Sequence, residues 1–219
     1  KLQTPTGMIA GVSLNNHMLL AAGVLGTTAA SLSRILRLGA GGVVTKSIGP
    51  KPKDGHHGPS LIPVSGGILN AMGLPNPSAQ FAIEIAPLLT AQKPVVVSIF
   101  GGTPAEFAKV AEWFPDAPAF ELNLSCPHVE GYGAAIGANP QVVLECTEAV
   151  KTFGKPVWVK LTPNVADISV IGRAAEDGGA DAIVAINTVK AMRISTGIRR
   201  PVLGNKFGGL SGTAVFPIV

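Results

Sequence analysis

Two lysines and several asparagines lie at or near the ends of apolar runs, where polar side chains are least expected. Lys46 ends the run 42–46, and Lys160 falls in the run 156–161. A lysine inside a protein is costly unless it meets an anion or an electron-rich ring, so this pair favours a negatively charged ligand. Amides offer donors and an acceptor, which suits a planar ring with alternating carbonyl and N–H groups. The amides that could do this belong to Asn70, Asn76, Asn123 and Asn187.

The two cysteines of the chain lie in different contexts. Cys126 follows the apolar run 119–124 and precedes the glycine-rich segment 131–133. A free cysteine often packs as a small apolar side chain, but one at the carboxyl end of a strand is within reach of a substrate. Position alone leaves both interpretations of Cys126 open. Cys146 falls in the middle of a helical pattern, and we expect it to pack in the core.

Six short, mostly apolar runs must position these residues, and amphipathic helical patterns lie between them. Nearly continuous apolar runs are typical of parallel strands buried on both faces. Helix starts are indicated by Thr103-Pro104 with a capping Glu106, by Asn139-Pro140 and by Asp167. Repeated strand–helix units predict a parallel sheet with right-handed crossovers. The six runs are residues 17–23, 42–46, 94–99, 119–124, 156–161 and 181–187.

The positions of the polar residues favour a closed barrel over an open sheet. No GxGxxG motif follows the first run. Lys46, Ser98, Asn123, Lys160 and Asn187 all lie near the carboxyl ends of their runs, which converge on one mouth in a barrel and spread along an edge in an open sheet. We therefore predict an α/β fold, a (β/α)8 TIM barrel formed by a single domain over residues 1–219. About six of the eight strand–helix units are expected in this chain, without the two C-terminal ones.

Composition excludes several classes of protein. The 219 residues are 47% hydrophobic and 14% charged, which provides a large core and argues against disorder. The net charge of +4 is scattered, so we expect no nucleic-acid partner. Polar residues at 15–16 and 27–28 interrupt the apolar N-terminal region, so neither a membrane span nor a signal peptide is expected. Two cysteines without CxxC spacing fit a reducing cytoplasm.

Two glycine-rich segments are candidates for covering a ligand. Residues 51–77 are too long for an ordinary loop between a strand and a helix, so we expect an active-site excursion or lid. His56-His57 within it have no evident third ligand, and we predict no metal. Residues 208–212 could wrap a cofactor with backbone N–H groups at a helix start.

Five motifs, in order over essentially the whole chain, resemble class 1 dihydroorotate dehydrogenase. They are Leu-Asn-Ala-Met-Gly-Leu-Pro-Asn-Pro at 69–77, Asn-Leu-Ser-Cys-Pro at 123–127, Lys-Leu-Thr-Pro-Asn at 160–164, Ile-Asn-Thr at 186–188 and Gly-Gly-Leu-Ser-Gly at 208–212. The resemblance implies an FMN-dependent barrel enzyme that oxidises dihydroorotate to orotate in pyrimidine (UMP) biosynthesis. The cysteine points to class 1, because the membrane-associated class 2 uses serine there.

The resemblance also implies roles for individual residues. Cys126 would be the catalytic base that removes the C5 proton of the substrate while a hydride passes from C6 to flavin N5. Substrate-binding residues would be Lys46, Asn70, Ala71, Met72, Gly73, Leu74, Asn123, Asn187 and Thr188. Cofactor-binding residues would be Ala22, Lys46, Ser47, Ser98, Asn123, Lys160, Ile186 and Gly212.

The chain departs from the family pattern at three places. His128 stands where many members have a substrate-binding asparagine, and Ser98 stands where an asparagine often contacts the flavin. The glycine loops after strands 7 and 8, which hold the FMN phosphate in the family, are not seen in this sequence. If these loops are absent, FMN binding should be severely weakened.

Residues 69–77 are most similar to the NAD-linked 1B type, whose catalytic subunit pairs with an iron–sulfur, FAD-containing electron-transfer subunit. The alternative acceptor is fumarate, used by homodimeric 1A enzymes. Because this chain has no GxGxxG and only two cysteines, NAD reduction would require a partner chain. We expect a homodimer or heterotetramer in the cytoplasm.

Two other functions stay open at this point. A related flavin barrel could act on another dihydropyrimidine, and comparing dihydroorotate with dihydrouracil would separate the two. The chain could also be a non-catalytic barrel fragment, which would retain flavin without turnover.

Overall fold

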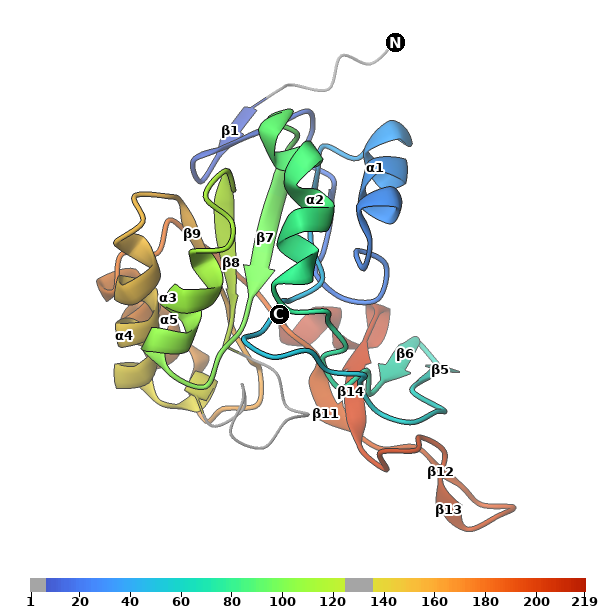
Figure 1. Cartoon of the computed structure of the whole chain (residues 1–219). Coiled ribbons are helices and arrows are strands. Elements are labelled where there is room, and N and C mark those ends of the chain that lie inside the picture. The colour runs from blue at the N-terminus through green and yellow to red at the C-terminus, as the bar shows by residue number, and fades with distance from the viewer. Residues whose placement is uncertain (1–6, 125–135) are drawn as a thin grey trace.

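The computed structural model describes residues 7–124 and 136–219, and a six-stranded parallel sheet lies at its centre (Figure 1). The strand order is β10-β9-β8-β7-β4-β3, with every neighbouring pair parallel. Each strand thus lies beside the one before it in this series, as in a barrel, whereas a doubly wound sheet reverses direction. All six predicted strands are confirmed: β3 (Leu19–Leu20), β4 (Gly42–Val44), β7 (Val95–Ile99), β8 (Ala119–Asn123), β9 (Val157–Lys160) and β10 (Ala182–Val184).

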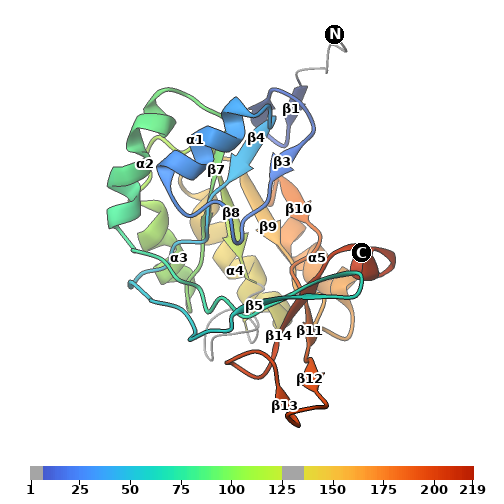
Figure 2. The ribbon, with the colours of Figure 1, turned by 90° about the vertical axis from the view of Figure 1, so that its right-hand side faces the viewer.

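Five α-helices of the described chain cover the outer face of this sheet (Figures 1 and 2). The three predicted helix starts are confirmed, since Thr103, Asn139 and Asp167 each accept a hydrogen bond from the first turn. The predicted role of Glu106 in a capping box is wrong, because its carboxylate accepts from the Gly102 N–H at 2.7 Å instead. The helices are α1 (Ala29–Arg37), α2 (Gln80–Thr90), α3 (Pro104–Ala111), α4 (Pro140–Lys151) and α5 (Ile168–Asp177).

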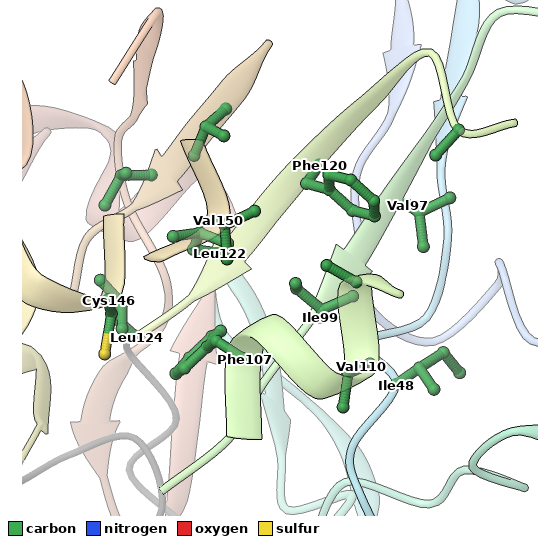
Figure 3. Packing of buried hydrophobic residues seen from close by; sticks show 14 of the residues in the cluster. Ile48, Val97, Ile99, Phe107, Val110, Phe120, Leu122, Leu124, Cys146 and Val150 are labelled. Atoms are coloured by element: carbon green, nitrogen blue, oxygen red, sulfur yellow. The ribbon is translucent and has the colours of Figure 1, made fainter. Parts of the chain in front are cut away.

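The main hydrophobic core lies between the helices and the outward-facing side chains of the strands (Figure 3). Phe120 and Leu122 of β8 pack there with Phe107 of α3 and Val150 of α4. Cys146 of α4 is also fully buried in this cluster, which confirms its predicted packing role. Burial, together with the charge of Glu145, raises the pKa of the Cys146 thiol to about 12, so it stays protonated at neutral pH.

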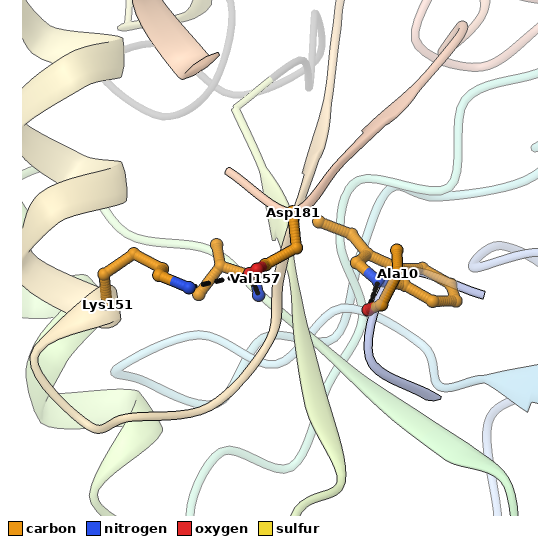
Figure 4. A network of polar contacts seen from close by, with 5 residues as sticks. Ala10, Lys151, Val157 and Asp181 are labelled. Carbon is orange, nitrogen blue, oxygen red and sulfur yellow. Dashed lines mark hydrogen bonds and ion pairs between the residues drawn. The ribbon is translucent and has the colours of Figure 1, made fainter. Parts of the chain in front are cut away.

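The amino ends of the strands are closed by a hairpin of β1 (Gly7–Ile9) and β2 (Val12–Leu14). Its side chains pack on the inward-facing Val44, Val96, Ala119 and Trp158. The Trp158 Nε1–H donates to the Ala10 carbonyl at 3.1 Å (Figure 4). This layer is apolar, so the polar chemistry of the inner face is confined to the layers nearer the carboxyl ends.

A second, antiparallel sheet of order β11-β14-β6-β5 lies beyond the carboxyl ends of the parallel strands (Figure 2). The segment 51–77, expected as a loop excursion, supplies two of these strands. Residues 208–211 form another strand rather than a loop, and a 3-10 helix η2 (Thr213–Ile218) follows Gly212, so the expected role in wrapping a cofactor stays a prediction. The strands are β5 (Leu61–Val64), β6 (Gly67–Asn70), β11 (Val189–Ala191) and β14 (Gly208–Ser211); a small hairpin of β12 (Ile194–Ser195) and β13 (Arg200–Pro201) and a 3-10 turn η1 (Ile136–Ala138) complete the described elements.

The architecture is that of a partial (β/α)8 barrel. Within the described residues, β3 and β10 stand at the two ends of the parallel sheet and have a strand partner on one side only. This agrees with the prediction of about six of the eight strand–helix units.

Candidate functional site

A cavity of about 510 Å³ lies between the carboxyl ends of the parallel strands and the antiparallel sheet. The two sheets approach each other because the chain leaves β10 and enters β11 within a few residues. Most of the residues to which the family resemblance assigns a role line this cavity. They are Ala22, Lys46, Ser47, Asn70, Met72, Gly73, Leu74, Asn123, Lys160, Ile186, Asn187, Thr188 and Gly212.

Other predicted residues do not line the cavity. Ala71 and Ser98 are fully buried behind its wall. Asn76 is buried elsewhere, where its Oδ1 accepts from the backbone N–H groups of Gly49 and Ser78. Cys126 and His128 lie outside the described residues, so their predicted roles stay predictions.

Two lysines bring positive charge to the cavity wall. Lys46 and Lys160 are each only 7% exposed, although both line the cavity. The Lys160 Nζ donates to the Ala22 carbonyl at 3.4 Å, and Lys160 is in register with Asn123 on the neighbouring strand. An anionic or electron-rich ligand would offset the cost of burying these ammonium groups.

A chain of hydrogen bonds joins the polar residues of β7, β8 and the loops that follow β4 and β10. The Asn187 Nδ2 donates to the Asn123 Oδ1 at 3.3 Å, and the Asn123 Nδ2 donates to the Ser47 Oγ at 2.9 Å. The hydroxyls of Ser47 and Ser98 are 2.9 Å apart. Because hydrogen-bonded side chains in a buried network hold one another in place, this wall is preorganised for a polar ligand.

The antiparallel sheet supplies the opposite wall, and its glycines allow close approach. The Asn70 Nδ2 donates to the Gly209 carbonyl at 3.3 Å. A Cβ on Gly209 would lie 1.8 Å from the Thr188 Oγ1, so only glycine fits beside this cavity residue. The Thr188 segment is held by Asn164, whose Nδ2 donates to the Thr188 carbonyl and whose Oδ1 accepts from the Lys190 N–H.

Sequence reasoning missed several residues of the site. The motif at 160–164 predicts no role for Asn164, and the sequence pattern places Glu121 only within an apolar run. The Glu121 side chain accepts from the Ser98 hydroxyl at 3.0 Å beneath the cavity wall. A charged residue inside an otherwise apolar run was the signal that could have identified it. Backbone and apolar lining residues without a motif were also missed, among them Leu20, Val24, Leu25 and Val215.

Over residues 7–124 and 136–219, no group of three or more His, Cys, Asp or Glu side chains is arranged to hold a metal ion. In the same part of the chain, none of the helices has both the length and the apolar character needed to cross a bilayer.

Comparison with known proteins gives a consistent result. The family model described as dihydroorotate dehydrogenase matches residues 6–219. The chain is 61% identical over 221 residues to the dihydroorotate dehydrogenase B (NAD(+)) catalytic subunit of Methanosarcina mazei, which covers 96% of this chain and 69% of the relative. It is 58% identical over 210 residues to the protein of the same name from Methanocella arvoryzae, which covers 95% of this chain and 70% of the relative.

A solved structure supports the fold. The crystal structure of ligand-free DHODH from Eimeria tenella matches with a TM-score of 0.81 at 17% identity, over 100% of this chain and 71% of that one. The resemblance predicted from the five motifs is therefore confirmed, and the chain belongs to the dihydroorotate dehydrogenase family.

Proposed function

We propose that this chain is the catalytic part of a B-type dihydroorotate dehydrogenase, which oxidises (S)-dihydroorotate to orotate in de novo pyrimidine biosynthesis. That it is an oxidoreductase acting on dihydroorotate follows from family membership. The observation that carries the rest is the gathering of thirteen residues predicted from the family resemblance around one cavity. Two chemically different sets meet there, buried ammonium groups and hydrogen-bonded amides.

The cavity suits the flavin on which the family depends. Its lining combines apolar side chains with the Lys46 and Lys160 ammonium groups and with amides, a donor set matched to a flat, electron-rich ring that carries carbonyls. When bound, the flavin would supply the hydride acceptor for substrate oxidation. We propose FMN as this flavin, held by Ala22, Lys46, Ser47, Asn123, Lys160, Ile186 and Gly212, with Ser98 acting through Ser47.

The same lining can bind the substrate. The Lys46 ammonium can pair with a carboxylate or a ring carbonyl, and asparagine amides can hydrogen-bond the alternating N–H and carbonyl groups of a dihydropyrimidine. The proposed substrate-binding residues are Lys46, Asn70, Ala71, Met72, Gly73, Leu74, Asn123, Asn187 and Thr188; all but the buried Ala71 line the cavity.

We propose Cys126 as the base that takes the C5 proton of the substrate. Its support is the sequence motif and its position three residues after the end of β8, which carries the cavity residue Asn123. An ordinary thiol has a pKa of ~8.5, so the rate should rise with pH as the thiolate forms.

We also propose a partner chain as the route to NAD. The named relatives are catalytic subunits of NAD-linked enzymes. In the proposed assembly an iron–sulfur, FAD-containing subunit takes electrons from this chain, within a cytoplasmic heterotetramer; a homodimer that uses fumarate is the competing assembly. Copurification with a second subunit, against turnover of the single chain with fumarate, separates the two.

An anaerobic visible spectrum tests the activity. The purified chain is mixed with FMN, and the flavin absorbance is recorded before and after addition of dihydroorotate. Bleaching is expected with dihydroorotate and not with dihydrouracil, which lacks the carboxylate. Bound flavin that dihydroorotate leaves oxidised would contradict the proposal.

A further inference from the structure

Glu121 is a buried carboxylate on the inner face of β8, and the proposed function gives it no role. It is 1% exposed, and it is the one carboxylate among the buried residues of 7–124 and 136–219. Its neighbours Phe120 and Leu122 pack in the outer core, so Glu121 faces inward with Asn123. Register pairs Glu121 directly with Ser98 of β7, which explains the 3.0 Å hydrogen bond between them.

Each serine hydroxyl in the buried network has one proton to donate, and this fixes which group donates in each hydrogen bond. Ser98 donates its single hydroxyl proton to the Glu121 Oε1. In the 2.9 Å contact between the two hydroxyls, Ser47 must therefore be the donor and Ser98 the acceptor. With its proton used, Ser47 can only accept from the Asn123 side chain, which must turn its NH2 group toward Ser47.

The other end of the network has a fixed direction as well. The backbone N–H of Thr188 can only donate, and it donates to the Asn187 Oδ1 at 2.8 Å. Asn187 then presents its NH2 group to the Asn123 Oδ1. The five hydrogen bonds thus run one way, from a backbone donor at Thr188 to a carboxylate acceptor at Glu121.

We propose that Glu121 is a positioning residue that, through Ser98 and Ser47, holds the NH2 side of the Asn123 amide and so, together with the Thr188 N–H at the other end, fixes the donor and acceptor edges that Asn123 and Asn187 present to the ring in the cavity. An amide turned by 180° exchanges donor and acceptor with almost no change in shape. If the Asn123 and Asn187 amides were free to turn, the cavity would accept rings of either hydrogen-bonding pattern. Glu121 therefore contributes to ligand selectivity without touching the ligand, and the identity of the ring rests on the proposed function.

Ligand discrimination gives the first test. Binding of orotate is compared by calorimetry with binding of citrazinate, which has the same shape but carbon in place of the ring N–H next to the carboxylate-bearing carbon. We expect Glu121→Leu to lower the ratio of the two affinities about tenfold, the factor expected for one charge-assisted hydrogen bond. Glu121→Gln keeps an acceptor for Ser98 and should restore most of the ratio.

Two further variants separate positioning from general damage. Ser98→Ala removes the hydroxyl that links Ser47 to Glu121 in the hydrogen-bond network. It should lower the ratio of the orotate and citrazinate affinities as Glu121→Leu does. Glu84→Gln is the matched control, because it removes an exposed carboxylate that accepts from the Ala29 N–H away from the cavity. A purely structural role would lower the melting temperature and both affinities together and leave the ratio unchanged, which would overturn the proposal.

A second measurement needs no ligand. Solvent exchange of the Asn123 side-chain NH2 protons is followed by 15N NMR, with Asn123→Asp for assignment. We expect slow exchange in the native chain and exchange about tenfold faster in Glu121→Leu and Ser98→Ala; equal exchange in all three would overturn the proposal.

If the native chain binds no orotate, the proposed function fails while this measurement still decides the role of Glu121. If Glu121→Leu does not fold, the smaller change Ser98→Ala carries both tests.

Discussion

The parallel and the antiparallel sheet both border the cavity, but they are built differently. Every residue of β7, β8 and β9 is buried, whereas β5 and β11 alternate between partly buried and exposed positions. The parallel sheet holds its polar cavity residues in a connected hydrogen-bond network. The antiparallel sheet contributes the Asn70 amide, Leu210 and Ser211 to the cavity lining, and Asn70 is held by the main chain of β14. The buried parallel sheet can therefore supply the charged and directional groups, and the second sheet borders the same cavity from the other side.

The strongest prediction concerns chemistry at the carboxyl end of the parallel sheet. Cys126→Ala should lower turnover at neutral pH about 10²- to 10⁴-fold while flavin is retained, because general base catalysis contributes on that order. Cys126→Ser should keep a trace of activity that grows at high pH. Steady-state turnover with dihydroorotate measures both effects.

Cys146 provides the internal control for that prediction. Its thiol is fully buried and has a pKa raised to about 12 by burial, so Cys146→Ala should leave turnover close to native. In the folded chain, iodoacetamide should modify Cys126 and spare Cys146. Unchanged turnover in Cys126→Ala would remove the base assignment.

The next prediction compares the same substitution in the two sheets. Leu122 of β8 is fully buried in the main core, and Leu61 of β5 is 40% exposed. Leu122→Ala should lower the free energy of unfolding by about 2–5 kcal/mol, and Leu61→Ala by about 1 kcal/mol or less. Urea unfolding of the two variants gives both values. Equal losses would show that the two sheets are equally important for stability.

This difference in burial also explains what sequence could predict. Buried parallel strands are continuous apolar runs, so all six were found, and polar residues at their ends pointed to the cavity. The antiparallel strands gave no such signal: β5 contains Pro63, and β6 pairs with β14 far along the chain, with Asn70 opposite Gly209. Local patterns carry no information about a pairing at that distance, so residues 51–77 and 208–212 were expected as loops.

Among the site residues, too, local sequence patterns predict some positions, whereas others depend on contacts between distant parts of the chain. Lys46, Asn123 and Lys160 could be predicted because each is a polar residue close to the end of an apolar run. Ser98 was predicted to touch the cofactor, but the structure buries it between Ser47 and Glu121, behind the wall. The role of Glu121 depends on strand register and on counting hydrogen-bond donors, and neither is visible in a single sequence.

A third prediction tests the fit of the covering sheet. Gly209→Ala places a Cβ 1.8 Å from the Thr188 Oγ1, so Thr188 or β14 must shift beside the cavity. We expect orotate binding to weaken about tenfold, corresponding to the loss of one good hydrogen bond to the ligand. Gly197→Ala is the matched control, because a Cβ there meets nothing within 4 Å. Native affinity in Gly209→Ala would mean that this wall adapts to the ligand.

The smallest effect concerns the amino ends of the parallel strands, away from the cavity. Asp181 accepts hydrogen bonds from the Lys151 Nζ at 2.8 Å and from the Val157 N–H at 2.7 Å (Figure 4). Desolvation raises the pKa of Asp181, but these hydrogen bonds and the charge of Lys151 outweigh it, so the pKa lies below its usual value. The carboxylate therefore stabilises the fold above the unfolded pKa of about 4, and this contribution is lost as pH falls through the folded value.

The pair is partly exposed, so solvent screening keeps its contribution small. Asp181→Asn should lower the free energy of unfolding by about 1 kcal/mol at pH 7, and the difference from native should shrink as the pH falls toward about 3. Asp116→Asn, which changes an exposed loop carboxylate, is the control. Since Asp181 lies far from the polar layer of the sheet, orotate affinity should stay native in this variant. A loss of orotate affinity in Asp181→Asn would mean that the amino ends of the parallel strands are coupled to the cavity. The cavity wall formed by the parallel sheet would then depend on the whole sheet and not only on the hydrogen bonds among its polar residues.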